Sequence, residues 1–187
     1  MAEAYVHDPV AFFIGVITAK SELLFPLRAI IESSIGKIAF ESEILRFDEF
    51  THYYEPEMGG GLLRVWIALE GIRPPESLIR LKWACTAIEN HFKKEGKRRV
   101  NLDPGYLTLA KVILATFKNF SHRIYLGDGV FADLQLMYRR KKFVPMEWTF
   151  ADYRSEGAQR FFLMLRESYK KWLKSYKNGQ LEPITGW

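Results

Sequence analysis

The sequence predicts an α+β protein in which helices pack on a mixed or antiparallel sheet. Short apolar runs rich in β-branched residues indicate strands, and longer runs with apolar residues at helical spacing indicate helices. The expected order β-α-β-β-α-β begins like the ferredoxin-like split βαβ arrangement, and a C-terminal hairpin and long helix follow. No repeat or low-complexity linker interrupts the 187 residues. We therefore expect a single domain, 1–187, with its core at about 10–177 and a tail at 178–187.

The first half of the chain is expected to hold three strands and two helices. Residues 11–19 are apolar and β-branched, which indicates a buried strand, and a helix follows Ser21 and ends at Gly36. The remaining elements are expected as a strand at 38–47, a loop at 50–61, a strand at 62–69 that pairs with the previous one, and a helix from Pro74 to Gly96.

The second half is expected to alternate short strands with two further helices. The expected elements are a strand at 98–102, a turn at Asp103-Pro104-Gly105, a short helix at 107–117, strands at 123–126 and 130–138 around Gly127-Asp128-Gly129, an extended segment at 143–148, and a long helix from Ser155 to about Lys177.

Composition favours a location in the cytoplasm. Cys85 is the sole cysteine, so no internal disulfide can form, and it is expected to be a small core residue. No apolar run is long enough to span a membrane, and the N-terminus lacks the pattern of a signal peptide. The net charge of +5 permits an anionic partner without requiring one.

Several common site motifs are absent from the sequence. The chain has no phosphate-binding loop of the GxxxxGK[ST] type, no GxGxxG after the first strand, no GxSxG elbow, no HExxH and no CxxC pair. The aromatic signature of an RNA recognition motif is also missing. These absences argue against the commonest nucleotide-hydrolase, dehydrogenase, hydrolase and zinc sites, and leave other enzymes open.

The first candidate site is the run from Arg99 to Lys111. Asn101 and Asp103 lie two residues apart at an expected strand end, so both side chains can point to one side. The free N–H groups of a helix beginning near Thr108 would suit an anion, with Tyr106 and Lys111 close by. The plainer interpretation is that Asp103 only stabilises the turn.

The second candidate site is the start of the strand at 123–126. His122 titrates near neutral pH and suits proton transfer, and Arg123 can bind a carboxylate or phosphate. We therefore assign catalytic roles to His122 and Asp103 and ligand-binding roles to the other residues. Those are Asn101, Tyr106, Lys111, Arg123 and Arg64. The alternative is that His122 forms only a structural hydrogen bond.

The third candidate is an acidic stretch. Glu41 and Glu43 are expected on one strand face, with Asp48 nearby, and carboxylates so placed suit a hard cation such as Mg²⁺. A solvated strand face, with Arg64 neutralising Glu43 across the hairpin, is the simpler interpretation. A fourth run, 148–154, has aromatic residues that could stack on a ring or serve as the hydrophobic staple of the last helix.

Three functions remain open on these residues. The first is binding of, or catalysis on, an anionic small molecule such as a nucleotide or phosphorylated metabolite. The second is RNA or other nucleic-acid binding, based on the basic loop 139–142 and the many aromatic residues. The third is a structural or partner-binding protein that uses the aromatic face of the last helix. The oligomeric state is open.

Four runs of the sequence resemble an uncharacterised bacterial family, numbered 4416 among the domains of unknown function. They are FESEILRFDEFTHYYEPEMG, RRVNLDPGYLTLAKVILAT, SHRIYLGDGVFADL and WTFADYRSE. The resemblance extends from about Phe12 to Lys174 and implies one domain. It implies no activity and no site residue. His52 stands where the resemblance leads us to expect an acidic residue, which argues against a metal role there.

Overall fold

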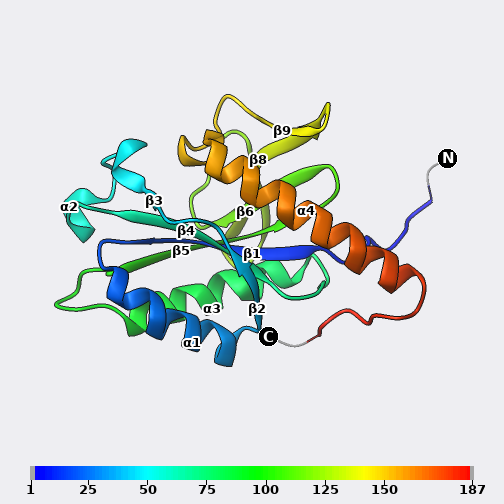
Figure 1. Ribbon diagram of the computed structural model, residues 1–187, viewed down its shortest axis with the longest axis horizontal. Coiled ribbons are helices and arrows are strands. Elements are labelled where there is room, and N and C mark those ends of the chain that lie inside the picture. The colour runs from blue at the N-terminus through cyan, green and yellow to red at the C-terminus, as the bar shows by residue number, and fades with distance from the viewer. Residues whose placement is uncertain (1–2, 186–187) are drawn as a thin grey trace.

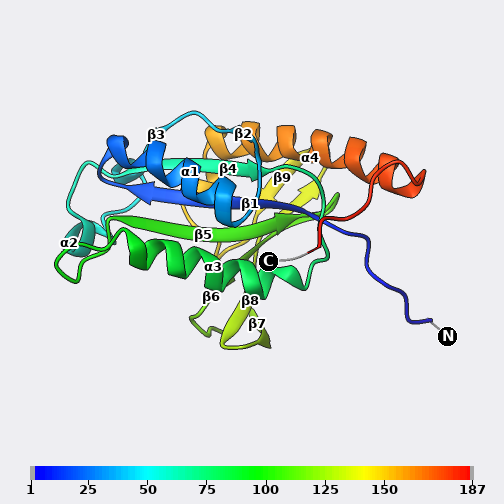
Figure 2. The same cartoon turned by 90° about the horizontal axis from the view of Figure 1, so that it is seen from below.

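The computed structural model, described over residues 3–185, has one mostly antiparallel sheet with helices on both faces (Figure 1). Helices α1 and α3 lie on one side of the sheet and α4 on the other (Figures 1 and 2). The strand order is β2-β4-β1-β5-β6-β8-β7, with β3 on β4 and β9 on β8. The predicted α+β class, C-terminal hairpin and long helix are confirmed.

The first four long strands form the predicted split βαβ arrangement. They are β1 (Ala11–Thr18), β2 (Ile38–Glu41), β4 (Leu63–Leu69) and β5 (Val100–Leu107). The first and third neighbour each other, the second lies outside the third, and the fourth lies beyond the first. Helices α1 (Leu24–Ser34, after the 3₁₀ turn η1, Ser21–Leu23) and α3 (Ser77–His91) cover one face.

The predicted strand at 38–47 is interrupted. The N–H of Ser42 still donates to the carbonyl oxygen of Trp66, but the N–H of Trp66 donates to the Ser42 hydroxyl, so the regular ladder ends there. Pairing with β4 resumes at β3 (Leu45–Arg46). The following segment contains the 3₁₀ turn η2 (Phe47–Glu49) and the one-turn helix α2 (Glu55–Met58). Both pieces of the strand pair with β4, as the predicted hairpin requires.

The predicted turn at Asp103 and the predicted helix at 107–117 are wrong. β5 continues without interruption through Asp103-Pro104-Gly105 to Leu107, and β6 (Lys111–Thr116) follows after a tight turn. The Thr108 hydroxyl accepts hydrogen bonds from the N–H groups of Ala110 and Lys111 in that turn. The helix N-terminus expected to bind an anion near Thr108 therefore does not exist.

The remaining elements follow the sequence more closely. β7 (Arg123–Gly127) and β8 (Val130–Arg139) form the predicted hairpin, in which Asp128 and Gly129 have φ angles of 48° and 75°. β9 (Lys142–Pro145) is shorter than expected, and the basic loop 139–142 is the tip of the β8–β9 hairpin.

The last helix begins where the sequence predicts. The Ser155 hydroxyl accepts a hydrogen bond from the N–H of Ala158 and caps α4 (Glu156–Lys177), which the 3₁₀ turn η3 (Asp152–Arg154) precedes. The aromatic face of α4 packs on the sheet through Phe161 and Phe162. No helix in residues 3–185 is long and apolar enough to cross a membrane.

Candidate functional site

A fork between β5 and β6 opens the sheet. The two strands pair only from Gly105, opposite Leu114, to Leu107, opposite Val112. Pro104 comes next in β5 and has no N–H to donate, so the ladder stops there and the strands diverge. Asp103 lines one side of the resulting pocket and Thr116 the other.

Side chains of α3 replace the missing strand partner of β5. Inside the fork, the N–H of Leu102 donates to Glu89 Oε1 at 2.6 Å. Lys82 Nζ donates to the carbonyl oxygen of Leu102 at 3.3 Å. Burial raises the pKa of Glu89. Both backbone groups of Leu102 are thus satisfied without β6, and the fork stays open.

The pocket at this fork has a volume of about 670 Å³. Its lining combines cations, carboxylates and aromatic rings. The cations are Arg64, Lys82, Arg98, Lys118 and Arg123. The carboxylates are Glu89, Asp103, Asp133 and Asp152. The aromatic residues are Phe47, Phe50, Tyr53, Tyr54, Phe117 and Phe150. Ligand sites of proteins have this size and this mixture of apolar walls and a few polar groups.

Arg64 lies at the buried floor of the pocket. Arg64 and Trp66 lie on the same face of β4, the face covered by α4, and the Arg64 guanidinium lies beside Gly15 of β1. Gly15 pairs with Trp66 of β4 and with Asp103 of β5. The rings of Trp66 and Tyr153 contact the guanidinium at 4.9 and 5.3 Å from Cζ. Because Gly15 has no side chain, the Arg64 guanidinium can lie directly against the sheet at this position.

The charge partner of Arg64 is Asp152. Arg64 Nη2 lies 2.8 Å from Asp152 Oδ2, and both side chains are almost fully buried. Burial raises the pKa of Asp152. The Nε and Nη1 groups of Arg64 have no hydrogen-bond partner within the described residues. Unsatisfied buried donors of this kind are uncommon in proteins and often mark a functional position.

A chain of polar contacts fixes Asp103. Asn101 Nδ2 donates to Asp103 Oδ2 at 2.8 Å, and Arg98 Nη1 donates to Asn101 Oδ1 at 2.7 Å. Arg98 also makes two hydrogen bonds with Glu57, at 2.7 and 2.6 Å, which hold the pKa of that carboxyl below its usual range. Asp103 Oδ1 lies 3.8 Å from Lys82 Nζ, which leaves this oxygen available to a ligand.

The segment from Phe47 to Gly61 covers part of the pocket. Its base is closed by Asp48, whose Oδ2 accepts hydrogen bonds from the N–H groups of Gly61 and Leu62. At the rim, Lys118 Nζ donates to the Tyr53 hydroxyl at 2.9 Å and lowers the pKa of that phenol. Tyr53 itself is 65% exposed, so this contact lies at the entrance.

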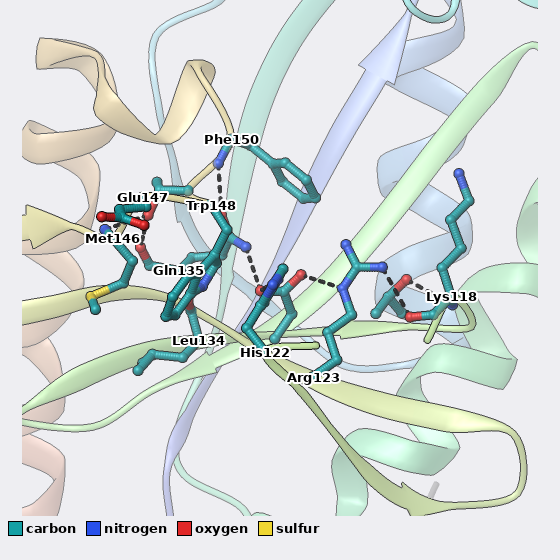
Figure 3. A network of polar contacts seen from close by, with 12 residues as sticks. Lys118, His122, Arg123, Leu134, Gln135, Met146, Glu147, Trp148 and Phe150 are labelled. Carbon is teal, nitrogen blue, oxygen red and sulfur yellow. Dashed lines mark hydrogen bonds and ion pairs between the residues drawn. The ribbon is translucent and has the colours of Figure 1, made fainter. Parts of the chain in front are cut away.

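Asp133 organises a second buried cluster beside the pocket. Arg123 Nε and Gln135 Nε2 donate to its two oxygens at 2.8 and 2.7 Å. His122 Nε2 lies 3.4 Å from Asp133 Oδ1, and its ring stacks on Trp148 with centroids 4.6 Å apart. Figure 3 shows His122 between Trp148 and Arg123. Arg123 and Asp133 line the pocket and His122 lies behind them.

Comparison with known proteins identifies a family. The family model described as "Domain of unknown function (DUF4416)" matches residues 8–169 of the chain. The chain belongs to this family. No curated protein and no solved structure matches it. Membership of DUF4416 identifies no ligand and no reaction.

Four of the residues expected to form a site line the same pocket of the DUF4416 chain. They are Asn101, Asp103, Arg64 and Arg123. Tyr106 lies on the opposite face of the sheet, where its ring meets Phe12 edge-on at 5.9 Å. Lys111 begins β6, roughly 10 Å along that strand from Leu114, where the fork opens, and it does not line the pocket. These two placements follow from the continuation of β5 and from the strand that replaces the expected helix.

The three carboxylates expected to hold Mg²⁺ are not brought together. Glu41 pairs with Arg28 of α1 at 2.6 Å, whereas Glu43 pairs with Arg160 of α4, on the other side of the sheet. The shared face expected for Glu41 and Glu43 is lost because the strand is interrupted between them. Asp48 is engaged with backbone N–H groups. Within residues 3–185 no group of three or more potential ligands is placed to hold a metal ion.

Arg64 does not neutralise Glu43 as the hairpin suggested, since its partner is Asp152. Sequence reasoning also missed most of the charged residues that line the pocket, namely Lys82, Glu89, Arg98, Lys118, Asp133 and Asp152. A signal was present for Asp133, a carboxylate among apolar residues in the alternating strand at 130–138. A charged residue at such a position is either exposed to solvent or buried with a partner of opposite charge.

Proposed function

We propose that the pocket binds an anionic small molecule that carries a ring, such as a nucleotide or another phosphorylated metabolite. The observation that supports this is a single cavity of about 670 Å³ in which five cationic side chains meet six aromatic rings. Arginine and lysine recognise phosphate and carboxylate groups, and aromatic side chains stack on planar rings.

The entrance favours a negatively charged ligand. Lys118 pairs with no carboxylate within the described chain, and its ammonium contacts only the hydroxyl and ring of Tyr53. Arg123, which lines the pocket next to it, donates to the carbonyl oxygen of Lys118 and so orders this part of the rim. A ligand anion that enters the pocket therefore meets an uncompensated positive charge first.

Asp103 is the residue best placed to accept a proton or a hydrogen bond from the ligand. Asn101 fixes one carboxylate oxygen, and the other lies beyond hydrogen-bonding distance of Lys82. His122 touches the pocket only through Asp133, so in this proposal it positions that carboxylate and does not contact the ligand.

A thermal-shift screen of nucleotides, nucleosides and sugar phosphates tests the proposal. A ligand at 100 times its Kd adds about 2.7 kcal/mol to the stability of the folded state. For a chain of this length that is a rise in Tm of roughly 5–10 °C. We expect phosphorylated compounds with a ring to give the largest shifts and the matching nucleosides to give smaller ones.

Variants at the rim locate the binding. Lys118→Ala is expected to weaken the best ligand by roughly tenfold, because a charge-assisted contact is lost. Lys171→Ala removes an exposed lysine from α4 and should leave the affinity unchanged. Equal effects of the two substitutions, or a screen in which no phosphorylated compound stabilises the protein, would contradict the proposal.

A further inference from the structure

The three arginines that line the pocket differ in how far their donors are used. Arg98 donates from Nε, Nη1 and Nη2 to Glu57 and Asn101. Arg123 donates from Nε to Asp133 and from Nη1 to the carbonyl of Lys118. Arg64 has one close charge partner, and its Nε and Nη1 have no hydrogen-bond partner in the described residues.

Because Arg64 is buried, N–H groups without a hydrogen-bond partner reduce the stability of the folded protein. Only 2% of the side chain is exposed, so bulk water hydrates these donors poorly and they need an acceptor from the protein or from a ligand in the pocket. The contact with Asp152 is itself incomplete, because Asp152 Oδ2 is also without a hydrogen bond in proper geometry. The rings of Trp66 and Tyr153 lie against one side of the guanidinium, 4.9 and 5.3 Å from Cζ and 5.5 Å from each other, and they offer no acceptor to the open donors.

We propose that the ligand's anionic group, a carboxylate or a phosphate, binds Arg64 at the floor of the pocket in competition with Asp152. This inference rests on the proposed function and adds the orientation of the ligand in the pocket. The anionic group reaches the floor, and the ring lies nearer the entrance among the aromatic residues. Asp152 then serves as an internal counterion that holds Arg64 in place when no ligand is bound.

The competition gives a test that small anions can perform. Asp152→Asn keeps the shape of the side chain and removes its negative charge, so the Arg64 guanidinium is left to an added anion. The probes are inorganic phosphate and acetate, each compared with chloride at equal ionic strength by thermal shift. We expect the apparent Kd for phosphate or acetate to fall on the order of tenfold in Asp152→Asn, because a like charge beside the anion is removed.

Two further variants complete the design. The double substitution Arg64→Met and Asp152→Asn removes both charges together, so that neither is left buried and unpaired, and it should abolish the specific effect of both anions. Glu41→Gln is the matched control, because it breaks another arginine–carboxylate pair, Arg28 with Glu41, outside the pocket. That control should respond to the anions as the unmodified protein does.

The inference is overturned if Asp152→Asn gains no more from phosphate or acetate than from chloride, or if the double variant keeps the anion effect. Its failure can be told apart from failure of the proposed function. If a phosphorylated ligand still stabilises the double variant and loses affinity in Lys118→Ala, the pocket binds the ligand but Arg64 does not receive its anionic group.

Discussion

At the scale of single residues, Gly15 explains how the sheet holds a buried arginine. A glycine inside a strand normally weakens it, because it adds no packing and has a flexible backbone. Here an added Cβ would lie 2.8 Å from Arg64 Nη1 and 3.1 Å from Cζ. The glycine therefore makes room for the guanidinium between Trp66 and Asp103.

Gly15→Ala is expected to destabilise the protein by about 1–3 kcal/mol, because the added Cβ would push the guanidinium away from Asp152 and from the rings of Trp66 and Tyr153. Urea denaturation measures the change. Gly60→Ala is the control, since the nearest side-chain atom to a Cβ at that position is 3.8 Å away. If the two substitutions cost the same, Gly15 does not have the role assigned to it.

At the scale of elements, the fork shows why sequence reasoning failed at β5. Asp-Pro-Gly is typical of a turn, yet here strand pairing prevails, because β1 pairs with β5 along its whole length. The Pro104 nitrogen, which carries no hydrogen, faces the fork, where β5 has no strand partner that could accept a hydrogen bond. Gly105 is needed for close approach and not for a turn, since a Cβ there would meet the carbonyl oxygen of Ile113.

The failure at residues 107–117 has a related cause. Leu109, Val112 and Ile113 fit helical spacing, but residues 112–115 also form a short continuous apolar run that contains β-branched residues, as a buried strand does. Periodicity alone cannot separate the two for so short a run. Local signals were sufficient where a motif determines its own geometry, as in the Gly127-Asp128-Gly129 hairpin and the Ser155 cap.

The link between α3 and β5 predicts a contrast between two substitutions of Glu89. Glu89→Gln keeps an acceptor for the N–H of Leu102, whereas Glu89→Leu leaves that N–H buried and unpaired. We expect Glu89→Leu to be less stable than Glu89→Gln by about 1–3 kcal/mol in chemical denaturation. Equal stability of the two variants would show that the contact does not support the fork.

The pH dependence of the Glu89→Gln variant follows from the raised pKa of Glu89. A carboxyl whose pKa is higher in the folded than in the unfolded state contributes stability that is present below the unfolded pKa and lost as pH rises through the folded one. The unmodified protein and Glu89→Gln should therefore be similar near pH 4, and the variant should be relatively more stable at pH 8. The opposite trend would mean that the charged carboxylate is stabilised by the fold.

At the scale of the whole molecule, the pocket forms where several distant segments meet. β5 and β6 supply the fork, α3 the lysine and glutamate, η3 the aspartate beside Arg64, and the segment 47–61 the aromatic cover. Sequence reasoning gathered Asn101 and Asp103 because they are neighbours in the chain. It could not gather Lys82 or Asp152, because only the sheet topology brings them to the same place.

The most direct test of the pocket as the binding site is an NMR titration of ¹⁵N-labelled protein with the phosphorylated compound that stabilises it most. The account predicts that the largest amide shifts fall at residues 101–103, 116–118 and 150–152, which border the fork. Shifts concentrated at the basic loop 139–142, with none around the fork, would contradict it and would favour a nucleic-acid surface on the β8–β9 hairpin.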